Sequence, residues 1–326
     1  MNNLIEVCSN FDISGEIIDI KPFGNGLINS TFSVNILNSN SEFILQKINH
    51  QIFKNVDLLQ DNIKRITDHI RIKLTENGET EIDRKTLTLI PAKDGKLFYF
   101  DGESYWRLTL KIADSVTCDI VNSRYAYFAG VAFGKFQSML ADIPGKPLGE
   151  TIPNFHNMEY RLIQFRNAVK SNIANRLPTV LELVKEVELR EHEMCQCERL
   201  FREGKLPKRI NHCDTKVKNI LFDKEGNVLC VIDLDTAMSG FVTSDFGDFM
   251  RTAANSGKED DTDLTKVSFQ MEIFEPYTCG YLESAKSFLT SLEIELLPFG
   301  AKLLTYMQFV RFLTDYLNGD TYYKID

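Results

Sequence analysis

The apolar residues of this chain change their spacing near residue 114, and this change limits the folds that are open to it. Before that point, short segments alternate between apolar and polar residues, as β-strands do: residues 15–23, 30–37, 41–49, 85–92, 96–100 and 104–112. One segment among them, residues 55–74, has apolar residues at helical spacing, and helical spacing dominates from residue 123 onward. The sequence therefore predicts an α+β fold, in which a small antiparallel β-sheet lobe with one helix precedes a larger, mainly helical lobe.

We expect the two lobes to comprise residues 1–116 and 117–326, with a hinge near Asp114 to Asp119. The net charge of −9, without a long basic stripe, argues against nucleic acid as the main partner. The N-terminal residues lack the basic start and apolar run of a signal peptide, and no apolar stretch approaches the length of a membrane span. The seven cysteines are scattered without the spacing of a zinc site. We therefore expect a cytoplasmic protein that does not bind a membrane.

A β-rich island, residues 209–235, interrupts the helical lobe and contains a dense polar loop with the spacing H-x-D-x-K-x-x-N, formed by His212, Asp214, Lys216 and Asn219. In phosphoryl transfer, a carboxylate such as Asp214 orients the attacking hydroxyl and accepts its proton. A lysine such as Lys216 stabilises negative charge near the γ-phosphate. The amide oxygen of Asn219 suits Mg²⁺, and His212 can brace the loop through its ring nitrogens. The alternative is a surface turn held by side-chain to backbone hydrogen bonds.

Two further carboxylates, Asp233 and Asp235, end the apolar strand VLCVIDLDT that follows this loop. A strand that delivers a carboxylate at its end places a metal ligand beside a catalytic loop. Because Mg²⁺ takes few protein ligands and several phosphate oxygens, Asn219 and Asp233 would be enough. The D-x-D metal site of a nucleotide-sugar glycosyltransferase is the alternative, but the hairpin between the two motifs favours a kinase.

The segment FGNGLINST, residues 23–31, lies between the first two predicted strands. Gly24 and Gly26 would let backbone N–H groups approach phosphate oxygens. The segment is not a Walker A loop, and Asn29 stands where the pattern G-x-G-x-x-G has its third glycine. Taken alone, GNG is more often a hairpin turn.

The order of these motifs is strand, glycine-rich loop, strand, FILQK strand, helix, H-x-D-x-K-x-x-N and I-D-x-D. This order resembles the aminoglycoside phosphotransferase and choline kinase superfamily, which has a protein-kinase-like fold, over nearly the whole chain. The segments FGNGLINSTF, FILQKINHQIFKN, IDLDTAMSG…DFGDFMR and RFLTDYLNGDTYYK further resemble the anomeric sugar kinases typified by N-acetylhexosamine 1-kinase. That resemblance implies transfer of the ATP γ-phosphate, with Mg²⁺, to the 1-hydroxyl of N-acetylgalactosamine or N-acetylglucosamine.

The resemblance also implies roles for single residues. It makes Asp214 the catalytic base, Asn219 and Asp233 the Mg²⁺ ligands, and Asp235 a supporting member of the metal site. The residues it assigns to the nucleotide, together with the third-strand position, are Gly24, Asn25, Gly26, Asn29, Ser30, Thr31 and Gln46.

For the amino sugar, the resemblance offers Arg311 and Tyr322. A guanidinium group presents a planar fork of donors that can hold hydroxyl or carbonyl oxygens. The alternatives are an ion pair of Arg311 with Asp315 on the helix surface, and a core position for the ring of Tyr322.

The chain departs from the wider kinase pattern on the third strand, where a lysine should face the α- and β-phosphates. Alternation allows either Gln46 or Lys47 to face the cleft, and the preferred register places the neutral Gln46 there. The usual ion pair with the following helix is then in doubt, because Gln60 and Asp61 occupy its positions. Leu27 stands where many relatives have histidine.

The segment DFGDFMR mimics the metal-binding D-F-G motif of protein kinases. Asp245 comes after Asp233 and follows a turn rather than an apolar strand, so we interpret it as a residue of a helix N-terminus. We expect Asp248 and Arg251 to be structural and to brace the loop that carries the metal ligand Asp233.

Three functions follow. The first is the N-acetylhexosamine kinase, and the second is a kinase of another small alcohol: homoserine, choline, ethanolamine or an aminoglycoside. The third is a nucleotide-binding pseudokinase, which Asp214, Asn219 and Asp233 argue against and Gln46 leaves open. The sequence does not predict the oligomeric state.

Overall fold

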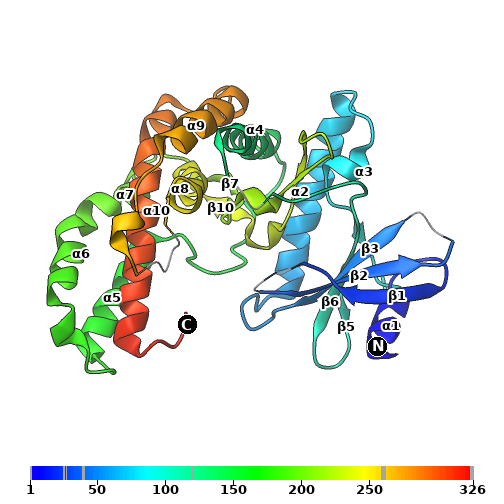
Figure 1. Ribbon diagram of the computed structural model, residues 1–326, viewed down its shortest axis with the longest axis horizontal. Helices are drawn as coiled ribbons and strands as arrows, with labels where there is room; N and C mark the ends of the chain where they lie inside the picture. Colours follow the sequence, from blue (N-terminus) through cyan, green and yellow to red (C-terminus); the bar gives the residue numbers. More distant parts are fainter. Residues whose placement is uncertain are drawn as a thin grey trace.

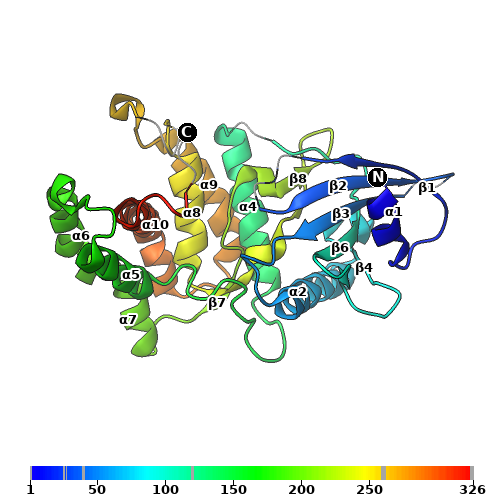
Figure 2. The same cartoon turned by 90° about the horizontal axis from the view of Figure 1, so that it is seen from below.

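The protein has two lobes at opposite ends of its long axis, a β-sheet lobe and a helical lobe (Figure 1). The computed structural model describes residues 2–24, 26, 28–38, 41–118, 121–257 and 262–323. A view turned by 90° shows the same division, with the sheet beside the N-terminus and the helices at the other end (Figure 2). The predicted α+β, two-lobed fold is therefore confirmed.

The sheet is antiparallel, with the strand order β1-β2-β3-β6-β4, and β5 pairs with β6. Its strands are β1 (Ile17–Pro22), β2 (Ser30–Ile36), β3 (Glu42–Ile48), β4 (Leu89–Ile90), β5 (Tyr99–Phe100) and β6 (Tyr105–Leu110). Each strand falls inside a segment that the sequence predicts to be extended. The long connection between β3 and β4 contains α2 (Val56–Glu76) and the short α3 (Ile82–Lys85).

The two faces of the sheet have different neighbours. On one face, Ile48 and Tyr105 pack with the apolar side of α2 and with residues of the helical lobe. On the other face, Leu45 and Leu108 form a second core with α1 (Asn2–Ser9), whose Cys8 is fully buried. The prediction of one helix in this lobe is wrong, because α1 also covers the sheet. Its eight residues are too short for a clear helical period.

The helical lobe contains α4 (Ser123–Met139), α5 (Met158–Ser171), the 3₁₀ helix η1 (Leu177–Thr179), α6 (Leu181–Met194), α7 (Gln196–Arg202), α8 (Val242–Ala253), the 3₁₀ helix η4 (Leu264–Lys266), α9 (Met271–Ala285) and α10 (Ser291–Asn318). Two glycines allow α8 and α10 to cross backbone to backbone. A Cβ atom at Gly247 would lie 2.1 Å from the carbonyl oxygen of Gly300, and one at Gly300 would lie 2.2 Å from that of Thr243. This crossing fixes where α8 presents its polar residues.

The β-rich island is present between α7 and α8, as predicted. Its elements are β7 (Arg209–Asn211), the 3₁₀ helix η2 (Val217–Asn219), β8 (Ile220–Phe222), β9 (Val228–Val231), the 3₁₀ helix η3 (Leu234–Thr236) and β10 (Met238–Gly240). Strand β7 pairs with β10, and β8 pairs with β9. The polar loop thus lies between two small hairpins, with α2 packed against η3.

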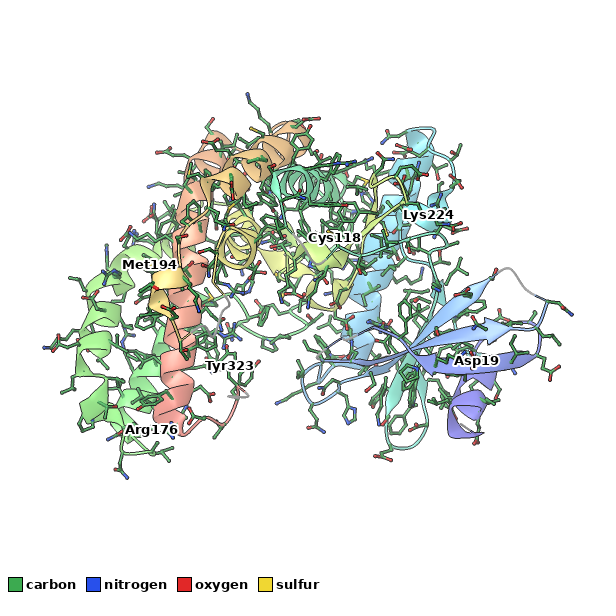
Figure 3. The ribbon with its side chains drawn as sticks, in the orientation of Figure 1. Asp19, Cys118, Arg176, Met194, Lys224 and Tyr323 are labelled. Carbon is green, nitrogen blue, oxygen red and sulfur yellow. The ribbon has the colours of Figure 1, made fainter. Side chains whose placement is uncertain are left out.

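The segment between β6 and α4 joins the lobes, and Cys118 lies in it (Figure 3). Val116 forms a β-bridge with Phe222, and Asp114 pairs with Lys224 at 2.5 Å. The hinge at this segment and the division at residue 116 stay predictions; Asp119 lies outside the described residues. Among the described helices, none has the combination of length and apolar character that crossing a bilayer requires.

Candidate active site

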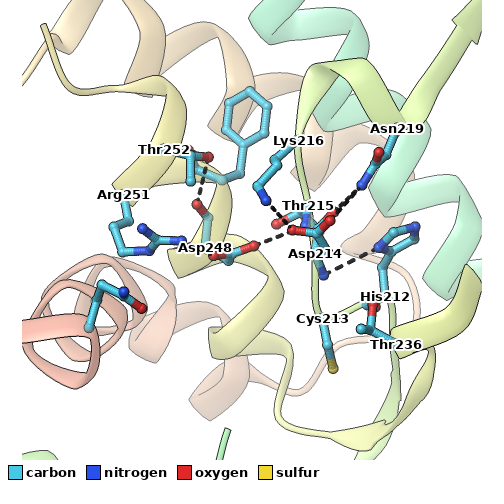
Figure 4. Close-up of polar contacts among 12 residues, drawn as sticks. His212, Cys213, Asp214, Thr215, Lys216, Asn219, Thr236, Asp248, Arg251 and Thr252 are labelled. Atoms are coloured by element: carbon cyan, nitrogen blue, oxygen red, sulfur yellow. Dashed lines mark hydrogen bonds and ion pairs between the residues drawn. The ribbon is translucent and has the colours of Figure 1, made fainter. Parts of the chain in front are cut away.

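The polar loop is held in shape by two carboxylates of α8. Asp245 accepts hydrogen bonds from the backbone N–H groups of His212 at 2.7 Å and Cys213 at 2.8 Å. Asp248 accepts one from the N–H of Thr215 at 3.0 Å (Figure 4). Cys213 has a φ of +62°, which turns the chain so that these donors point toward α8. The loop conformation is therefore fixed from behind by α8.

This bracing explains the DFG-like segment. Asp245 and Asp248 lie on α8 and are buried, and Arg251 donates to Asp248 at 2.9 Å. Burial raises the pKa of Asp245 to about 6, although its contacts with His212, Cys213 and Gln137 favour the ionised form. Burial likewise raises the pKa of Asp248. The two carboxylates are therefore structural, as predicted, but they brace the polar loop around Asp214 and not the loop of the metal ligand Asp233.

His212 is buried and connects the two hairpins of the island. Its Nε2 lies 2.8 Å from the carbonyl oxygen of Ile232, and its Nδ1 accepts from the N–H of Asp214 at 3.3 Å. The edges of Phe133 and Phe136 pack near its ring. The ring nitrogens of His212 therefore hold the loop in shape, and its side chain is not exposed to solvent.

Asp214 forms a tight group with Lys216 and Asn219 (Figure 4). Its Oδ1 lies 2.6 Å from Nζ of Lys216, and its Oδ2 accepts from the amide nitrogen of Asn219 at 3.0 Å. Burial would raise the pKa of Asp214, but Lys216, His212 and Asn219 outweigh it and hold that pKa below its usual range. The pKa of Lys216 is raised, because the attraction of Asp214 outweighs its burial. Asp214 is thus an ionised carboxylate at neutral pH, partly open to solvent.

Asp233 lies next to this group. The N–H of Ile232 donates to the carbonyl oxygen of Asn219 at 2.9 Å, which places the two predicted metal ligands on neighbouring chain segments. Asp233 has a φ of +60° and is exposed. Desolvation by the surrounding protein, followed by the charges of Asp235 and Asp214, raises its pKa to about 6, while Arg107 and Lys216 act in the opposite direction. A carboxylate with this shift gains from a nearby cation.

These residues fit a magnesium ion. The amide nitrogen of Asn219 is directed to Asp214, so its amide oxygen is left for a cation. No group of three histidine, cysteine, aspartate or glutamate ligands exists within the described ranges. Asn219 and Asp233 would supply one amide oxygen and one carboxylate, and Mg²⁺ takes one or two carboxylates and completes its shell with phosphate oxygens and water.

Asp235 differs from the predicted metal ligand. It is buried, forms an ion pair with Arg107 of β6, and accepts from the amide of Asn29 at 2.6 Å. Both of its oxygens are therefore engaged by the sheet lobe, and we assign it the supporting role. Asn29 also accepts from the N–H of Asn49 at 2.9 Å, so its side chain connects the glycine-rich segment to the end of β3 and, through Asp235, to the helical lobe.

The glycine-rich segment closes the hairpin of β1 and β2, where the N–H of Phe23 donates to the carbonyl oxygen of Thr31. Gly24 has a φ of +70°, and a Cβ atom there would meet no other atom within 4 Å. Gly26 lies in the same turn and Ser30 begins β2. Asn25 and Leu27 lie outside the described residues. The nucleotide-binding role of this segment stays a prediction.

Gln46 faces the cleft, as the preferred register predicts. Its amide nitrogen donates to the hydroxyl of Thr31 at 3.1 Å, and its oxygen accepts from Nε of Arg107 at 2.9 Å. Lys47 is on the opposite face, with its Nζ 5.8 Å from the ring centroid of Trp106. Gln60 of α2 is buried, and its amide has no hydrogen-bond partner among the described residues.

Arg311 lies on α10, and Tyr322 follows the end of this helix with its ring packed against that of Tyr323, which Figure 3 labels. Arg311 of α10 donates to Gln308 at 3.0 Å, and its guanidinium carbon lies 5.6 Å from the ring centroids of both Phe155 and Tyr323. Tyr322 is 66% exposed, which excludes the alternative of a core position for its ring.

The alternative ion pair of Arg311 with Asp315 is not what the structure shows. Asp315 instead accepts from the backbone N–H groups of residues 321, 322 and 323, at 2.9–3.0 Å. Asp315 therefore anchors the segment that carries Tyr322, and the guanidinium group of Arg311 faces Phe155 and Tyr323 instead.

Sequence reasoning missed a group of arginines around His156. His156 lies in the loop before α5, stacked on Phe155, and its Nδ1 is buried without a partner among the described residues. Burial, followed by the charges of Arg311, Arg161 and Arg251, lowers the pKa of His156 to about 3. Asp214 acts on the same ring in the opposite direction. These residues come from α5, α8, α10 and a loop, so no local spacing in the sequence could have grouped them.

A cavity of about 660 Å³ lies elsewhere in the helical lobe, among α6, α8 and α10. Most of its lining is apolar, and it includes Met194, Met250 and Phe309. It reaches the catalytic region only through Arg251. We therefore build the active site on the polar group around Asp214 and not on this cavity.

Comparison with known proteins gives one family match, and it covers half of the chain. The model of a family described as phosphotransferase enzyme family matches residues 105–270, which include β6, the catalytic loop and α8.

Solved structures with a similar fold are small-molecule kinases. An ethanolamine kinase from Plasmodium vivax matches with a TM-score of 0.55 and 14% identity, over 98% of this chain and 80% of that one. The ADP-bound aminoglycoside phosphotransferase APH(2″)-Ib matches with 0.54 and 10%, over 95% and 88%. A choline kinase from Streptococcus pneumoniae matches with 0.51 and 14%, over 99% and 93%. At these identities, the similarity shows the fold.

Proposed function

Because the chain belongs to the phosphotransferase enzyme family, we propose that it transfers the γ-phosphate of ATP to the anomeric 1-hydroxyl of N-acetylgalactosamine or N-acetylglucosamine. The use of ATP is supported by the similarity in fold to an ADP-bound phosphotransferase and by the glycine-rich turn next to Thr31 and Gln46. Asp214, Lys216 and Asn219 supply the groups that the chemistry needs.

The positive charge of the arginines around His156 is the observation that favours a sugar as the acceptor. Arg311 and Arg161 both contact Phe155, whose ring stacks on His156. The charges of these arginines and of Asp214 all act on His156, so we infer that guanidinium groups lie on the acceptor side of the proposed base. Choline, ethanolamine and aminoglycosides are cations, and they would need acidic or aromatic surroundings. A neutral sugar instead offers hydroxyl and amide oxygens, which accept hydrogen bonds from a guanidinium fork.

In the proposed reaction, Asp214 orients the acceptor hydroxyl. Its low pKa keeps the carboxylate ionised at neutral pH, so that it accepts a hydrogen bond from the hydroxyl and takes its proton late, when the bond to the leaving group is largely broken. Lys216 shares its positive charge with the transferred phosphoryl group. Mg²⁺ held by Asn219 and Asp233 would neutralise charge on the β- and γ-phosphates. Thr31 and Ser30 lie where the triphosphate would pass the sheet lobe.

A second acceptor, homoserine, is favoured by the same observation. Its carboxylate is a planar anion that an arginine can bind through two parallel hydrogen bonds. The guanidinium groups of Arg311 and Arg161 therefore make homoserine a better alternative than choline or an aminoglycoside.

An ADP-release assay over N-acetylhexosamines, plain hexoses, homoserine, choline and kanamycin tests the proposal. We expect turnover with the N-acetylhexosamines and none above background with choline or kanamycin. If only a non-sugar acceptor responds, the sugar assignment fails and the kinase assignment survives. ATP hydrolysis that no acceptor increases would support a pseudokinase instead.

Substitution of Arg311 tests the acceptor side directly. Arg311→Gln should raise the KM for the sugar by about 10-fold while the KM for ATP stays unchanged, because a charge-assisted hydrogen bond is lost. Lys302→Gln is the matched control, since Lys302 is a cation of the same helix that pairs with Glu193 on the surface. An equal change of both KM values in Arg311→Gln would contradict the assignment.

A further inference from the structure

The position of Gln46 leaves the sheet without a cation where kinases of this fold place a lysine. Strand β6 lies next to β3, and their register pairs Gln46 with Arg107 and Lys47 with Trp106. Side chains that are paired across neighbouring strands point to the same face of the sheet. Arg107 therefore shares the cleft face with Gln46, while Lys47 lies on the face covered by α1.

Arg107 is almost fully buried, with 4% of its surface exposed, and it is held at two points. Its Nε donates to the amide oxygen of Gln46, and its Nη1 pairs with Asp235. A guanidinium group carries five N–H donors, so these contacts orient the plane of the group and leave further donors for a ligand.

The surroundings of Arg107 are those of the proposed nucleotide site. Gln46, its partner across the strands, also binds the hydroxyl of Thr31, the last residue of the glycine-rich segment. On the other side, Arg107 pairs with Asp235, which is two residues after the predicted metal ligand Asp233. Arg107 thus lies between the predicted phosphate loop and the predicted metal ligand.

We propose that Arg107 is the residue of the sheet lobe that binds the nucleotide phosphates, with Gln46 and Asp235 as its positioning residues. The inference rests on the proposed function, because it assumes that a nucleoside triphosphate occupies the cleft. A planar guanidinium matches two phosphate oxygens at once, which a lysine does not.

This assignment also accounts for the neutral residue on β3. Like charges that lie directly opposite each other on neighbouring strands destabilise a sheet. A lysine at position 46 would face Arg107 across the strands, whereas the amide oxygen of Gln46 accepts a hydrogen bond from it. Gln46 is therefore the consequence of moving the cation to β6, and not the loss of a nucleotide site.

The test compares the affinities of the protein for ATP, ADP and AMP. They are measured by calorimetry on the full chain with Mg²⁺ and without an acceptor. We expect Arg107→Gln to weaken binding of ATP and ADP by about 10- to 100-fold, because a charge-assisted contact with phosphate is lost. Binding of AMP should weaken by much less than binding of ATP and ADP, since AMP offers Arg107 only its α-phosphate. Lys47→Gln is the matched control and should leave all three affinities unchanged.

A second variant separates loss of contact from loss of fold. Gln46→Lys combined with Arg107→Gln returns the cation to β3, and we expect it to recover part of the preference for ATP over AMP. If Arg107→Gln alone does not fold, the double variant Arg107→Gln with Asp235→Asn removes both buried charges. Its affinities for ATP, ADP and AMP are then measured instead.

Two outcomes would overturn the inference: equal weakening of ATP, ADP and AMP, which indicates a brace between the lobes, or unchanged affinities. The proposed function fails separately. It is overturned if the wild-type protein binds ATP, Arg107→Gln weakens ATP and ADP more than AMP, and yet no acceptor increases ADP release. That result leaves the role of Arg107 intact. A wild-type protein that binds no nucleotide would overturn both.

Discussion

Two pairs of a carboxylate and a cation lie in the candidate site, and they differ in almost every physical respect. Asp214 and Lys216 are two residues apart in one loop, and their side chains are 28% and 35% exposed. Asp235 and Arg107 are 128 residues apart, belong to different lobes, and have side chains that are 3% and 5% exposed. The first pair lies open to the cleft, while the second is closed off between the lobes.

The difference in solvent exposure indicates which of the two pairs can change partners during a reaction. A partly exposed pair is more weakly bound than a buried one, so a substrate hydroxyl or a phosphate can replace one partner at lower cost. A buried pair loses much more if one partner is removed, because the other charge is left without compensation. We therefore expect the loop pair to exchange partners during the reaction. The pair between the lobes should stay intact, while Arg107 offers its remaining donors to the nucleotide.

Asp214→Asn should produce the largest effect. The variant keeps the shape of the side chain but cannot accept the proton, so kcat should fall by about 100- to 10,000-fold, the usual contribution of a general base. ATP affinity should stay close to that of the wild type, because Asp214 faces the acceptor. Steady-state kinetics and calorimetry measure the two quantities.

The matched control for this variant is Asp223→Asn. Asp223 is in the exposed turn of the same island, where its side chain accepts from the N–H groups of Glu225 and Asn227, which an asparagine oxygen can also do. We expect unchanged turnover there. Near-wild-type kcat in Asp214→Asn would remove Asp214 from its role as the base.

Asp235→Ala should have the next largest effect, and on stability. Breaking a buried pair typically costs about 3–5 kcal/mol of the free energy of unfolding, because Arg107 would remain buried and unpaired. Chemical denaturation measures this loss. Asp142→Ala serves for comparison, since Asp142 forms exposed pairs with Lys73 and His69, which are worth about 1 kcal/mol or less. Equal losses in the two variants would contradict the contrast between the pairs.

The two pairs also mark the limit of prediction from the sequence. His212, Asp214, Lys216 and Asn219 could be predicted because they are neighbours in one loop, where spacing alone brings them together. Arg107 could not be predicted, because its contact with Asp235 depends on how the two lobes meet.

The same distinction between local spacing and long-range contacts explains which other features could be predicted from the sequence. The strands and α2 follow from local periodicity, and so does the cleft-facing position of Gln46. The cationic group of His156, Arg161 and Arg311 depends on packing between helices that are far apart in the chain. The helix α1 was missed because its amphipathic pattern is shorter than the window that such a pattern needs.

Lys216→Met should change stability much less than Asp235→Ala. The pair that it breaks is partly exposed, so the free energy of unfolding should fall by about 1 kcal/mol or less. Any loss of turnover in this variant is then a loss of chemistry and not of fold. Denaturation under the conditions of the kinetic assay measures both in parallel, and a loss as large as that of Asp235→Ala would show that the loop pair is structural.

The smallest effect that we predict is a shift in the pH profile of kcat/KM for MgATP. The folded-state pKa of Asp233 is raised to about 6, and only its ionised form binds a cation. As pH falls through this value, Asp233 becomes protonated, so kcat/KM should fall on the acid side near pH 6. The base Asp214 does not set this limb, because its pKa is held below the usual range and it titrates at lower pH.

The two pairs should move this acid limb in opposite directions. Asp235 raises the pKa of Asp233, so Asp235→Asn should shift the limb to lower pH; Lys216 lowers that pKa, so Lys216→Met should shift it to higher pH. We expect each shift to be less than about one unit, because the removed charge is one of several that act on Asp233. Asp245 also has a pKa near 6, but burial and its contacts with the loop set that value. If neither variant moves the limb, the titrating group is Asp245, and the magnesium site must be assigned without Asp233.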